Sequence, residues 1–260
     1  MNGRVSRFDS DGLAIAYEVA GDGPPVVLVH GFASDRKRNW GNARWFETLI
    51  NAGRRIVALD CRGHGDSDKP HNPAAYTADL MSGDVVRLLD HLGIARADLM
   101  GYSMGGRIAA VLLVRHAERF GCAVLGGVGA GLVDERHGAE AIARALEADD
   151  AAGITDLTGQ AFRTFAEDGR NDLRALAACM RGMHHSVDAS DLDMIATPLL
   201  VVVGENDTLV GDPQRLVARI AGAELVTIPK RDHLSTVADR RYKEAALRFF
   251  AAHGVGLGAY

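Results

Sequence analysis

The chain has 260 residues, of which 47% are hydrophobic and 24% charged, with a formal net charge of −5 and a pI near 6.0. This composition is typical of a globular protein that buries a full core, and it excludes a disordered chain. Lys and Arg are scattered, so we expect no nucleic-acid partner. Apolar runs are far shorter than the ~20 residues that span a bilayer, and residues 1–18 carry charges throughout, so we expect a cytoplasmic protein without a membrane segment.

The cysteines and histidines do not form a metal-binding pattern. Cys61, Cys122 and Cys179 lie far apart without zinc-like spacing, which indicates thiols in a reducing compartment. His184-His185 and Asp188 could be drawn as a metal site, but adjacent side chains diverge and no further ligand is evident. No phosphate-cradling or dinucleotide glycine pattern follows a strand either, so we expect neither a metal nor an organic cofactor.

The N-terminal segments predict the start of a sheet. Residues 5–9 and 13–19 alternate apolar and polar residues about Ser10-Asp11-Gly12, which indicates an antiparallel hairpin. Residues 25–29 and 55–60 are short, continuously apolar runs, as expected of parallel strands covered on both faces. The sheet is therefore predicted to begin with an antiparallel edge and to continue as a parallel one.

Two loops follow these parallel strands. The loop Ser34–Gly41 is longer than most strand-to-helix connections, and we expect it to border a pocket. Its basic run Arg36-Lys37-Arg38 is interpreted as a solvated loop rather than a phosphate site. In the second loop, Asp60–Ser67, we interpret His64 as structural, and we interpret His30 in the same way.

Residues 97–102 predict another buried strand, and residues 107–116 predict a helix. Ser103 lies at the corner between them, flanked at two positions on either side by Gly101 and Gly105. A Cβ at either glycine would collide where strand and helix pass closely, so the spacing has a steric cause. The corner exposes a hydroxyl at a helix N-terminus, where negative charge is favoured. It is a suitable place for a nucleophile.

The region from residue 131 to residue 191 lacks apolar strands. Helical stretches are expected near 139–148, 154–166 and 172–183. A helical excursion between two strands would lie over the carboxyl ends of the sheet, where ligands bind. We therefore expect residues 1–130 and 192–260 to form the core domain, with residues 131–191 inserted as a cap that sets substrate choice.

The last part of the chain supplies an acid and a base. Asp207 follows the predicted strand 198–204, and His233 follows the predicted strand 223–228 ahead of a closing helix, residues 237–253. The order serine, acid, histidine, each past the end of a strand, is that of a hydrolase triad. Asp134 is a competing acid, because it follows the preceding strand.

Five motifs in order resemble the α/β-hydrolase superfamily over nearly the whole chain. They are His30-Gly31-Phe32, the segment Asp60-x-Arg62-Gly63-His64-Gly65-x-Ser67, the stretch Gly101–Gly106, Gly204-x-x-Asp207 and Asp232-His233. The resemblance implies a mostly parallel, eight-stranded twisted sheet with an antiparallel N-terminal edge, helices on both faces and a helical cap. It also implies Ser103, Asp207 and His233 as catalytic residues, with the backbone N–H groups of Phe32 and Met104 as the oxyanion hole.

The expected activity is hydrolysis of carboxylic esters of small or medium size through an acyl-enzyme. A serine at position 103 argues against haloalkane dehalogenases and epoxide hydrolases, which use aspartate there. Hydrolysis of a carbon–carbon bond or an enol-lactone in aromatic degradation, cofactor-free perhydrolase activity and a small-molecule receptor remain alternatives. The expected partner is a small ester-like molecule, and the substrate-binding residues and oligomeric state stay open.

Overall fold

The computed structural model describes residues 4–134, 138–183 and 187–256. Its eight strands form one sheet in the order β1-β2-β4-β3-β5-β6-β7-β8. The pairs β1–β2 and β2–β4 are antiparallel, and every other pair is parallel. The predicted α/β fold with an antiparallel N-terminal edge is thus confirmed. The strands are β1 (Val5–Ser10), β2 (Leu13–Ala20), β3 (Pro25–Val29), β4 (Arg55–Leu59), β5 (Ala97–Tyr102), β6 (Phe120–Gly126), β7 (Leu199–Gly204) and β8 (Glu224–Ile228).

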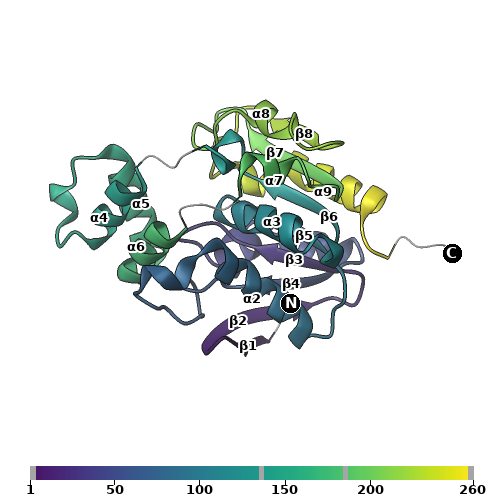
Figure 1. Cartoon of the computed structure of the whole chain (residues 1–260), viewed down its shortest axis with the longest axis horizontal. Coiled ribbons are helices and arrows are strands. Elements are labelled where there is room, and N and C mark those ends of the chain that lie inside the picture. The colour runs from purple at the N-terminus through teal and green to yellow at the C-terminus, as the bar shows by residue number, and fades with distance from the viewer. Residues whose placement is uncertain (1–3, 135–137, 184–186, 257–260) are drawn as a thin grey trace.

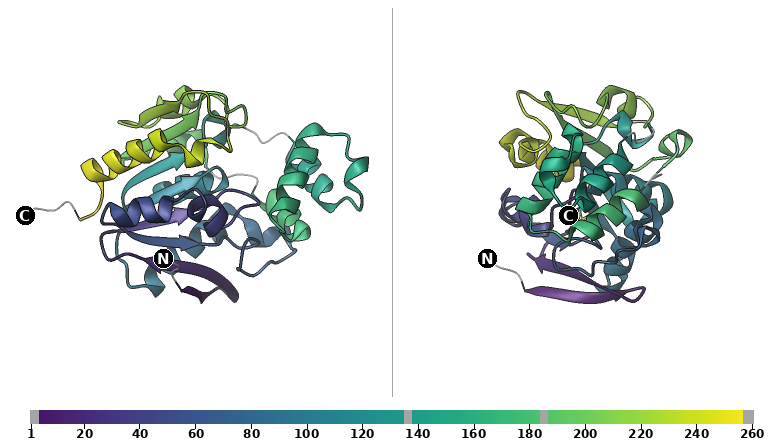
Figure 2. Two further views of the ribbon diagram at one scale, coloured as in Figure 1. Left: turned by 180° about the vertical axis from the view of Figure 1, so that it is seen from behind. Right: turned by 90° about the vertical axis from the view of Figure 1, so that its left-hand side faces the viewer.

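Helices cover both faces of this sheet (Figures 1 and 2). Helices α2 and α3 pack on one face, and α1 and α9 pack on the other. The helices are α1 (Trp45–Asn51), α2 (Ala78–His91), α3 (Met104–Arg115), α4 (Ala139–Glu147), α5 (Leu157–Asp168), α6 (Leu173–Gly182), α7 (Ala189–Leu192), α8 (Pro213–Val217) and α9 (Arg240–His253). No helix in the described ranges has the length and apolar character needed to cross a membrane.

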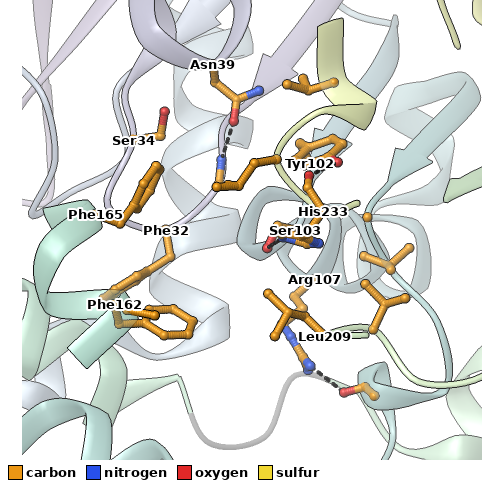
Figure 3. Close-up of a pocket in the computed structure, with 18 of the residues that line it drawn as sticks. Phe32, Ser34, Asn39, Tyr102, Ser103, Arg107, Phe162, Phe165, Leu209 and His233 are labelled. Atoms are coloured by element: carbon orange, nitrogen blue, oxygen red, sulfur yellow. Dashed lines mark hydrogen bonds between the residues drawn. The ribbon is translucent and has the colours of Figure 1, made fainter. Parts of the chain in front are cut away.

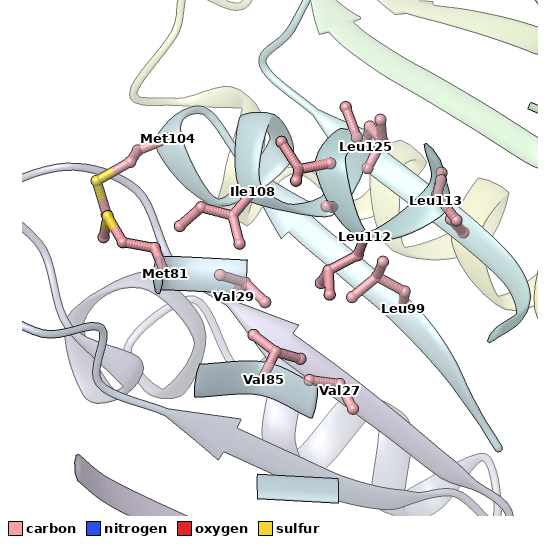
Figure 4. Packing of buried hydrophobic residues seen from close by; sticks show 14 of the residues in the cluster. Val27, Val29, Met81, Val85, Leu99, Met104, Ile108, Leu112, Leu113 and Leu125 are labelled. Atoms are coloured by element: carbon pink, nitrogen blue, oxygen red, sulfur yellow. The ribbon is translucent and has the colours of Figure 1, made fainter. Parts of the chain in front are cut away.

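Helix α3 is anchored on the sheet by its apolar side (Figure 4). Ile108 and Leu112 are fully buried in the same cluster as Val29 and Leu99 of the central strands. Burying a side chain of this size contributes about 1.5–3 kcal/mol. The helix that follows Ser103 is therefore held firmly against β3 and β5.

Three predicted helix starts are wrong. Helix α3 starts at Met104 instead of residue 107, directly after Ser103. In the other two helices a capping aspartate explains the difference. Helix α5 starts at Leu157 instead of residue 154, because the Asp156 side chain accepts a hydrogen bond from the Gly159 N–H. Helix α9 starts at Arg240 instead of residue 237, because Asp239 accepts from the Arg241 N–H. In α5 and α9 the apolar pattern extends into the turn that precedes the cap.

Helices α4, α5 and α6 lie between β6 and β7 in the chain and stand to one side of the sheet (Figure 1). They share an apolar cluster of their own, which includes Ile142, Leu146 and Leu176 and also takes in Ala33 of the loop after β3. Because Ala33 follows the carboxyl end of β3, these helices meet the sheet at its carboxyl edge.

Candidate active site

Ser103 connects β5 to α3 through a sharp turn. Its backbone has φ 54° and ψ −111°, in a region that residues with side chains rarely adopt. A Cβ on Gly101 would overlap the Gly105 carbonyl, and a Cβ on Gly105 would overlap the Val29 carbonyl. The two glycines thus allow the helix to pass the strands closely enough for the turn to form.

Ser103, His233 and Asp207 form one hydrogen-bonded chain. His233 Nε2 lies 2.9 Å from Ser103 Oγ, and His233 Nδ1 lies 2.7 Å from Asp207 Oδ2. The Asp207 side chain is fully buried, whereas that of His233 is 15% exposed. This arrangement lets the imidazole take a proton from the hydroxyl while the carboxylate fixes its orientation.

Asp134, the competing acid, points elsewhere. Its side chain is exposed and lies 3.4 Å from the guanidinium of Arg215, while it also borders the cavity beside Ser103. In the structure Asp207, and not Asp134, contacts His233.

The two residues expected to supply oxyanion donors flank Ser103. Met104 is the first residue of α3, so its N–H has no acceptor within the helix. Phe32 lies in the turn after β3, one residue beyond Gly31, and Gly31 borders Ser103. Both backbone groups belong to segments that lie at the carboxyl edge of the sheet.

Tyr102 was not predicted as a site residue. Its hydroxyl donates a 2.5 Å hydrogen bond to the His233 carbonyl, and its ring lies 5.5 Å from the imidazole. Burial raises the pKa of Tyr102, so the hydroxyl stays protonated and remains a donor. This bond ties the loop that carries His233 to the strand that precedes Ser103.

A cavity of about 760 Å³ opens beside Ser103 and His233, between the sheet edge and helices α4 to α6 (Figure 3). Its apolar wall includes Phe32, Phe162 and Phe165, which lie together on one side of Ser103. Leu209 and Leu234 also line the cavity and are more than half exposed. The volume and lining suit a small, largely apolar organic molecule.

The loop after β3 borders this cavity, as expected, through Ser34, Arg38 and Asn39. The prediction that its basic run is solvated is wrong for Arg36. That side chain is only 5% exposed and pairs with the fully buried carboxylate of Asp60. A run of like charges indicates a solvated loop only when no buried partner exists, and the local sequence does not show Asp60, the buried acid 24 positions away that neutralises Arg36.

Arg38 connects this loop to the helical region. Its guanidinium lies over the Phe165 ring of α5, 5.3 Å from the ring centre. An arginine over an aromatic face gains about 0.5–2 kcal/mol, depending on how dry the site is. The cavity wall on this side is thus formed jointly by the loop after β3 and by α5.

His30 and His64 are buried beneath the site and bond to the backbone. His30 Nε2 accepts a hydrogen bond from the Cys61 N–H, and His64 Nδ1 lies 3.0 Å from the Arg62 carbonyl oxygen. Burial lowers the pKa of His30 below its usual value. Burial is also the main reason why the pKa of His64 is lowered to about 3, and the neighbouring imidazole of His30 is a smaller cause. Both contacts are those of structural residues, as expected.

The described part of the chain contains no cluster of three or more histidine, cysteine or acidic side chains that could hold a metal ion. The candidate His184-His185 pair lies outside the described residues. Cys61, Cys122 and Cys179 are buried thiols.

A family model for the alpha/beta hydrolase fold matches residues 24–177. The chain therefore belongs to the alpha/beta hydrolase fold family. Among curated relatives it is 28% identical to the putative 2-succinyl-6-hydroxy-2,4-cyclohexadiene-1-carboxylate synthase of Bacillus subtilis, over 92% of this chain and 95% of that protein. It is also 38% identical to epoxide hydrolase 2 of Siraitia grosvenorii, but over only 44% of this chain and 35% of that one.

Among solved structures, the chain is similar to a hydrolase from Pseudomonas aeruginosa PA01. The two are 29% identical with a TM-score of 0.79, and the match covers 99% of each chain. The similarity thus extends over the sheet and over helices α4 to α6.

Proposed function

We propose that the protein is a serine hydrolase that cleaves carboxylic esters of small or medium size. The observation that carries this proposal is the chain of contacts from Ser103 Oγ through His233 to the buried carboxylate of Asp207. Family membership supports a hydrolase, and the serine at the turn supplies the nucleophile.

In the proposed reaction, His233 takes the proton of Ser103 as Oγ attacks the ester carbonyl, and Asp207 stabilises the imidazolium that forms. The N–H groups of Phe32 and Met104 donate to the oxygen that becomes negative. The alcohol leaves with the proton held by His233, which produces an acyl-enzyme. Water, activated by the same histidine, then releases the acid and restores Ser103.

The cavity supports a substrate of limited size. Residues 131–191 act in this proposal as a cap, because Phe162 and Phe165 of α5 form part of the cavity wall. A volume of about 760 Å³ holds a short or medium acyl group together with its alcohol, and its largely apolar lining disfavours highly charged molecules.

Pre-steady-state kinetics with p-nitrophenyl acetate test the proposal. The wild type is expected to release a burst of p-nitrophenol that matches the enzyme concentration, and Ser103→Ala is expected to lose the burst and nearly all turnover. Far-ultraviolet circular dichroism checks that the variant is folded. Undiminished turnover by Ser103→Ala contradicts the proposal, and absence of turnover in the wild type indicates a binding protein.

A further inference from the structure

Arg38 is a cation in the cavity wall that has no carboxylate partner in the described part of the chain. It lies in the turn Lys37–Gly41 and borders the cavity beside Ser103. Its neighbour Arg36, by contrast, pairs with the buried carboxylate of Asp60. The guanidinium nitrogens of Arg38 make no hydrogen bond and no ion pair with any residue that the structure describes.

Helix α5 holds this guanidinium in place without satisfying its donors. The central carbon of the guanidinium lies 5.3 Å from the centre of the Phe165 ring. A Cβ on Gly169, the residue that ends α5, would overlap Nη1 of Arg38. The negative end of the helix dipole favours a cation at this place. An arginine that only capped α5 would also donate hydrogen bonds to the last carbonyls of the helix, and the described residues contain no such bond from Arg38.

One edge of the guanidinium is open to a ligand. Of its three nitrogens, only Nη1 is fully buried, so Nε and Nη2 keep accessible surface. Stacking on a ring occupies the flat face of a guanidinium, whereas its N–H bonds lie in the plane and stay available. The edge formed by Nε and Nη2 is opposite Nη1 and therefore points away from the end of α5. Its parallel N–H bonds are a pair that can bind both oxygens of one carboxylate.

A second polar group lies in the same part of the wall. The carbonyl of Ala33 accepts a hydrogen bond of 3.0 Å from the side-chain amide of Asn171, just beyond α5. A Cβ on Gly169 would overlap this amide as well as Nη1 of Arg38. The segment that carries Ser34, the residue after Ala33, thus meets Arg38 at the end of α5.

The Ser34 hydroxyl is available too. Ser34 borders the cavity on the same side of Ser103 as Phe165 (Figure 3). Its Oγ makes no hydrogen bond with a described residue and is not among the fully buried polar atoms. A hydroxyl can donate one further hydrogen bond to an oxygen that the guanidinium already binds.

The charge of this group of donors selects the chemistry of the ligand. One guanidinium balances one negative charge, so a single carboxylate leaves no charge unpaired in the cavity. A phosphate monoester carries nearly two charges and would leave one without a partner, which is costly in a largely apolar cavity. A neutral ligand would leave the cation itself unpaired.

We propose that Arg38, assisted by Ser34, binds a carboxylate of the substrate, so that the protein prefers esters that carry one carboxylate apart from the bond that is cleaved. This inference rests on the proposed function, because it places the ester bond of the same molecule at Ser103. It makes Arg38 a specificity-determining residue, since a site built to bind a polar group discriminates against the analogue that lacks it. The apolar part of the wall suits a hydrocarbon chain between the ester and the carboxylate.

Matched pairs of esters test this inference at pH 8, where carboxylates are ionised. The acidic esters are the monomethyl esters of succinic, glutaric, adipic and pimelic acid, with the carboxylate on the acyl side, and 4-acetoxybutanoate and 6-acetoxyhexanoate, with the carboxylate on the alcohol side. In each neutral partner an isopropyl group of similar shape replaces the carboxylate. The kcat/KM of each acid is divided by that of its neutral partner, and the pair with the highest ratio in the wild type is used for the variants.

Arg38→Gln and Arg38→Met remove the charge, and the control Lys37→Met removes the same charge from an exposed neighbour. The ratio is expected to fall about ten- to hundredfold in both Arg38 variants, the effect of losing a hydrogen bond between charged groups, and about threefold in Ser34→Ala. It is expected to change less than twofold in Lys37→Met. Far-ultraviolet circular dichroism checks that each variant is folded.

Three results overturn the inference. The first is a wild-type ratio below one for every pair. The second is a ratio within twofold of the wild type in both Arg38 variants. The third is an equally large fall in Lys37→Met, which would indicate a long-range effect of charge instead of a contact.

A binding measurement separates this inference from the proposed reaction. For at least one pair, calorimetry on Ser103→Ala is expected to show about tenfold tighter binding of the acid than of its neutral partner, and this preference is expected to vanish in Ser103→Ala/Arg38→Gln. Equal affinities within every pair in Ser103→Ala overturn the inference. If the preference is present but the wild type hydrolyses none of these esters, the proposed function fails and the assignment of Arg38 stands.

Discussion

Ser103 adopts a backbone conformation that costs about 1–3 kcal/mol for a residue with a side chain. With φ at 54°, the turn is stable only because the segments on both sides are held, β5 within the sheet and α3 by its buried apolar side. The result is a hydroxyl that projects from the edge of the sheet toward His233. His233, the hydrogen-bond partner of Ser103, is held in turn by the Tyr102 hydroxyl, which donates a hydrogen bond to the His233 carbonyl.

Substitution of the two candidate acids distinguishes their roles. Asp207→Asn is expected to lower kcat for p-nitrophenyl acetate by roughly 10²–10⁴, because His233 loses the charge that orients and stabilises its protonated form. Asp134→Asn is expected to change kcat less than threefold, since Asp134 faces Arg215. A larger loss in Asp134→Asn than in Asp207→Asn would transfer the role of the acid to Asp134.

The helices between β6 and β7 divide their bulky side chains between two tasks. Ile142, Phe162, Phe165 and Met180 border the cavity. Leu146 and Leu176 are buried within the cluster that the helices form with one another and do not line the cavity, whereas Ile142 and Met180 belong to the cluster as well as to the cavity wall. Substrate choice is therefore expected to depend most on Phe162 and Phe165, and the stability of the helical region on Leu146 and Leu176.

A series of p-nitrophenyl esters from acetate to palmitate tests this division. The wild type is expected to have its highest kcat/KM for short or medium acyl chains, because the cavity is limited in volume. Phe162→Ala or Phe165→Ala is expected to move this optimum toward longer chains while acetate is still hydrolysed. A palmitate optimum in the wild type, or an equal loss for all chain lengths in both variants, would contradict this role of α5.

The hydrophobic pattern was sufficient to predict the strands, because continuously apolar runs bounded by glycine leave few alternatives. It also placed Ser103, Asp207 and His233 at strand ends, and parallel strands bring those ends to one edge of the sheet. Tyr102 and Arg36 could not be found in this way. Their roles depend on partners 131 and 24 positions away, respectively, and no local pattern encodes those contacts.

The molecule as a whole buries several charged and titratable groups. Arg36 and Asp60 form a buried pair, and Arg62 pairs with the buried carboxylate of Asp84 at 2.6 Å. His64 is fully buried and neutral, with its Nδ1 beside the Arg62 carbonyl. The free energy of unfolding should therefore depend on pH in the acidic range.

His64 contributes to this dependence in a known direction. Its pKa is lowered to about 3 in the folded protein, so between about pH 6.5 and pH 3 the unfolded chain binds more protons than the folded one. Stability is accordingly lost as the pH falls through this window. Urea unfolding at pH 7 and pH 5 is expected to show that His64→Asn, which has no titrating ring, loses about 2 kcal/mol less than the wild type.

The control for this measurement is His253→Asn, at an exposed histidine near the end of α9. It is expected to show the same loss between the two pH values as the wild type. An equal loss in His64→Asn and the wild type would mean that His64 does not titrate in this window.

Covalent labelling tests the role of Ser103 most directly. The wild-type protein is treated with diisopropyl fluorophosphate, digested and analysed by mass spectrometry. We expect one diisopropylphosphorylated peptide, modified at Ser103 with loss of fluoride from the reagent, and loss of esterase activity in proportion to labelling, because the hydroxyl held by His233 is the activated nucleophile. His233→Ala, which keeps the serine but removes its base, is expected to be labelled far more slowly. Loss of activity with Ser103 unmodified, or labelling of His233→Ala at the wild-type rate, would contradict the proposed mechanism.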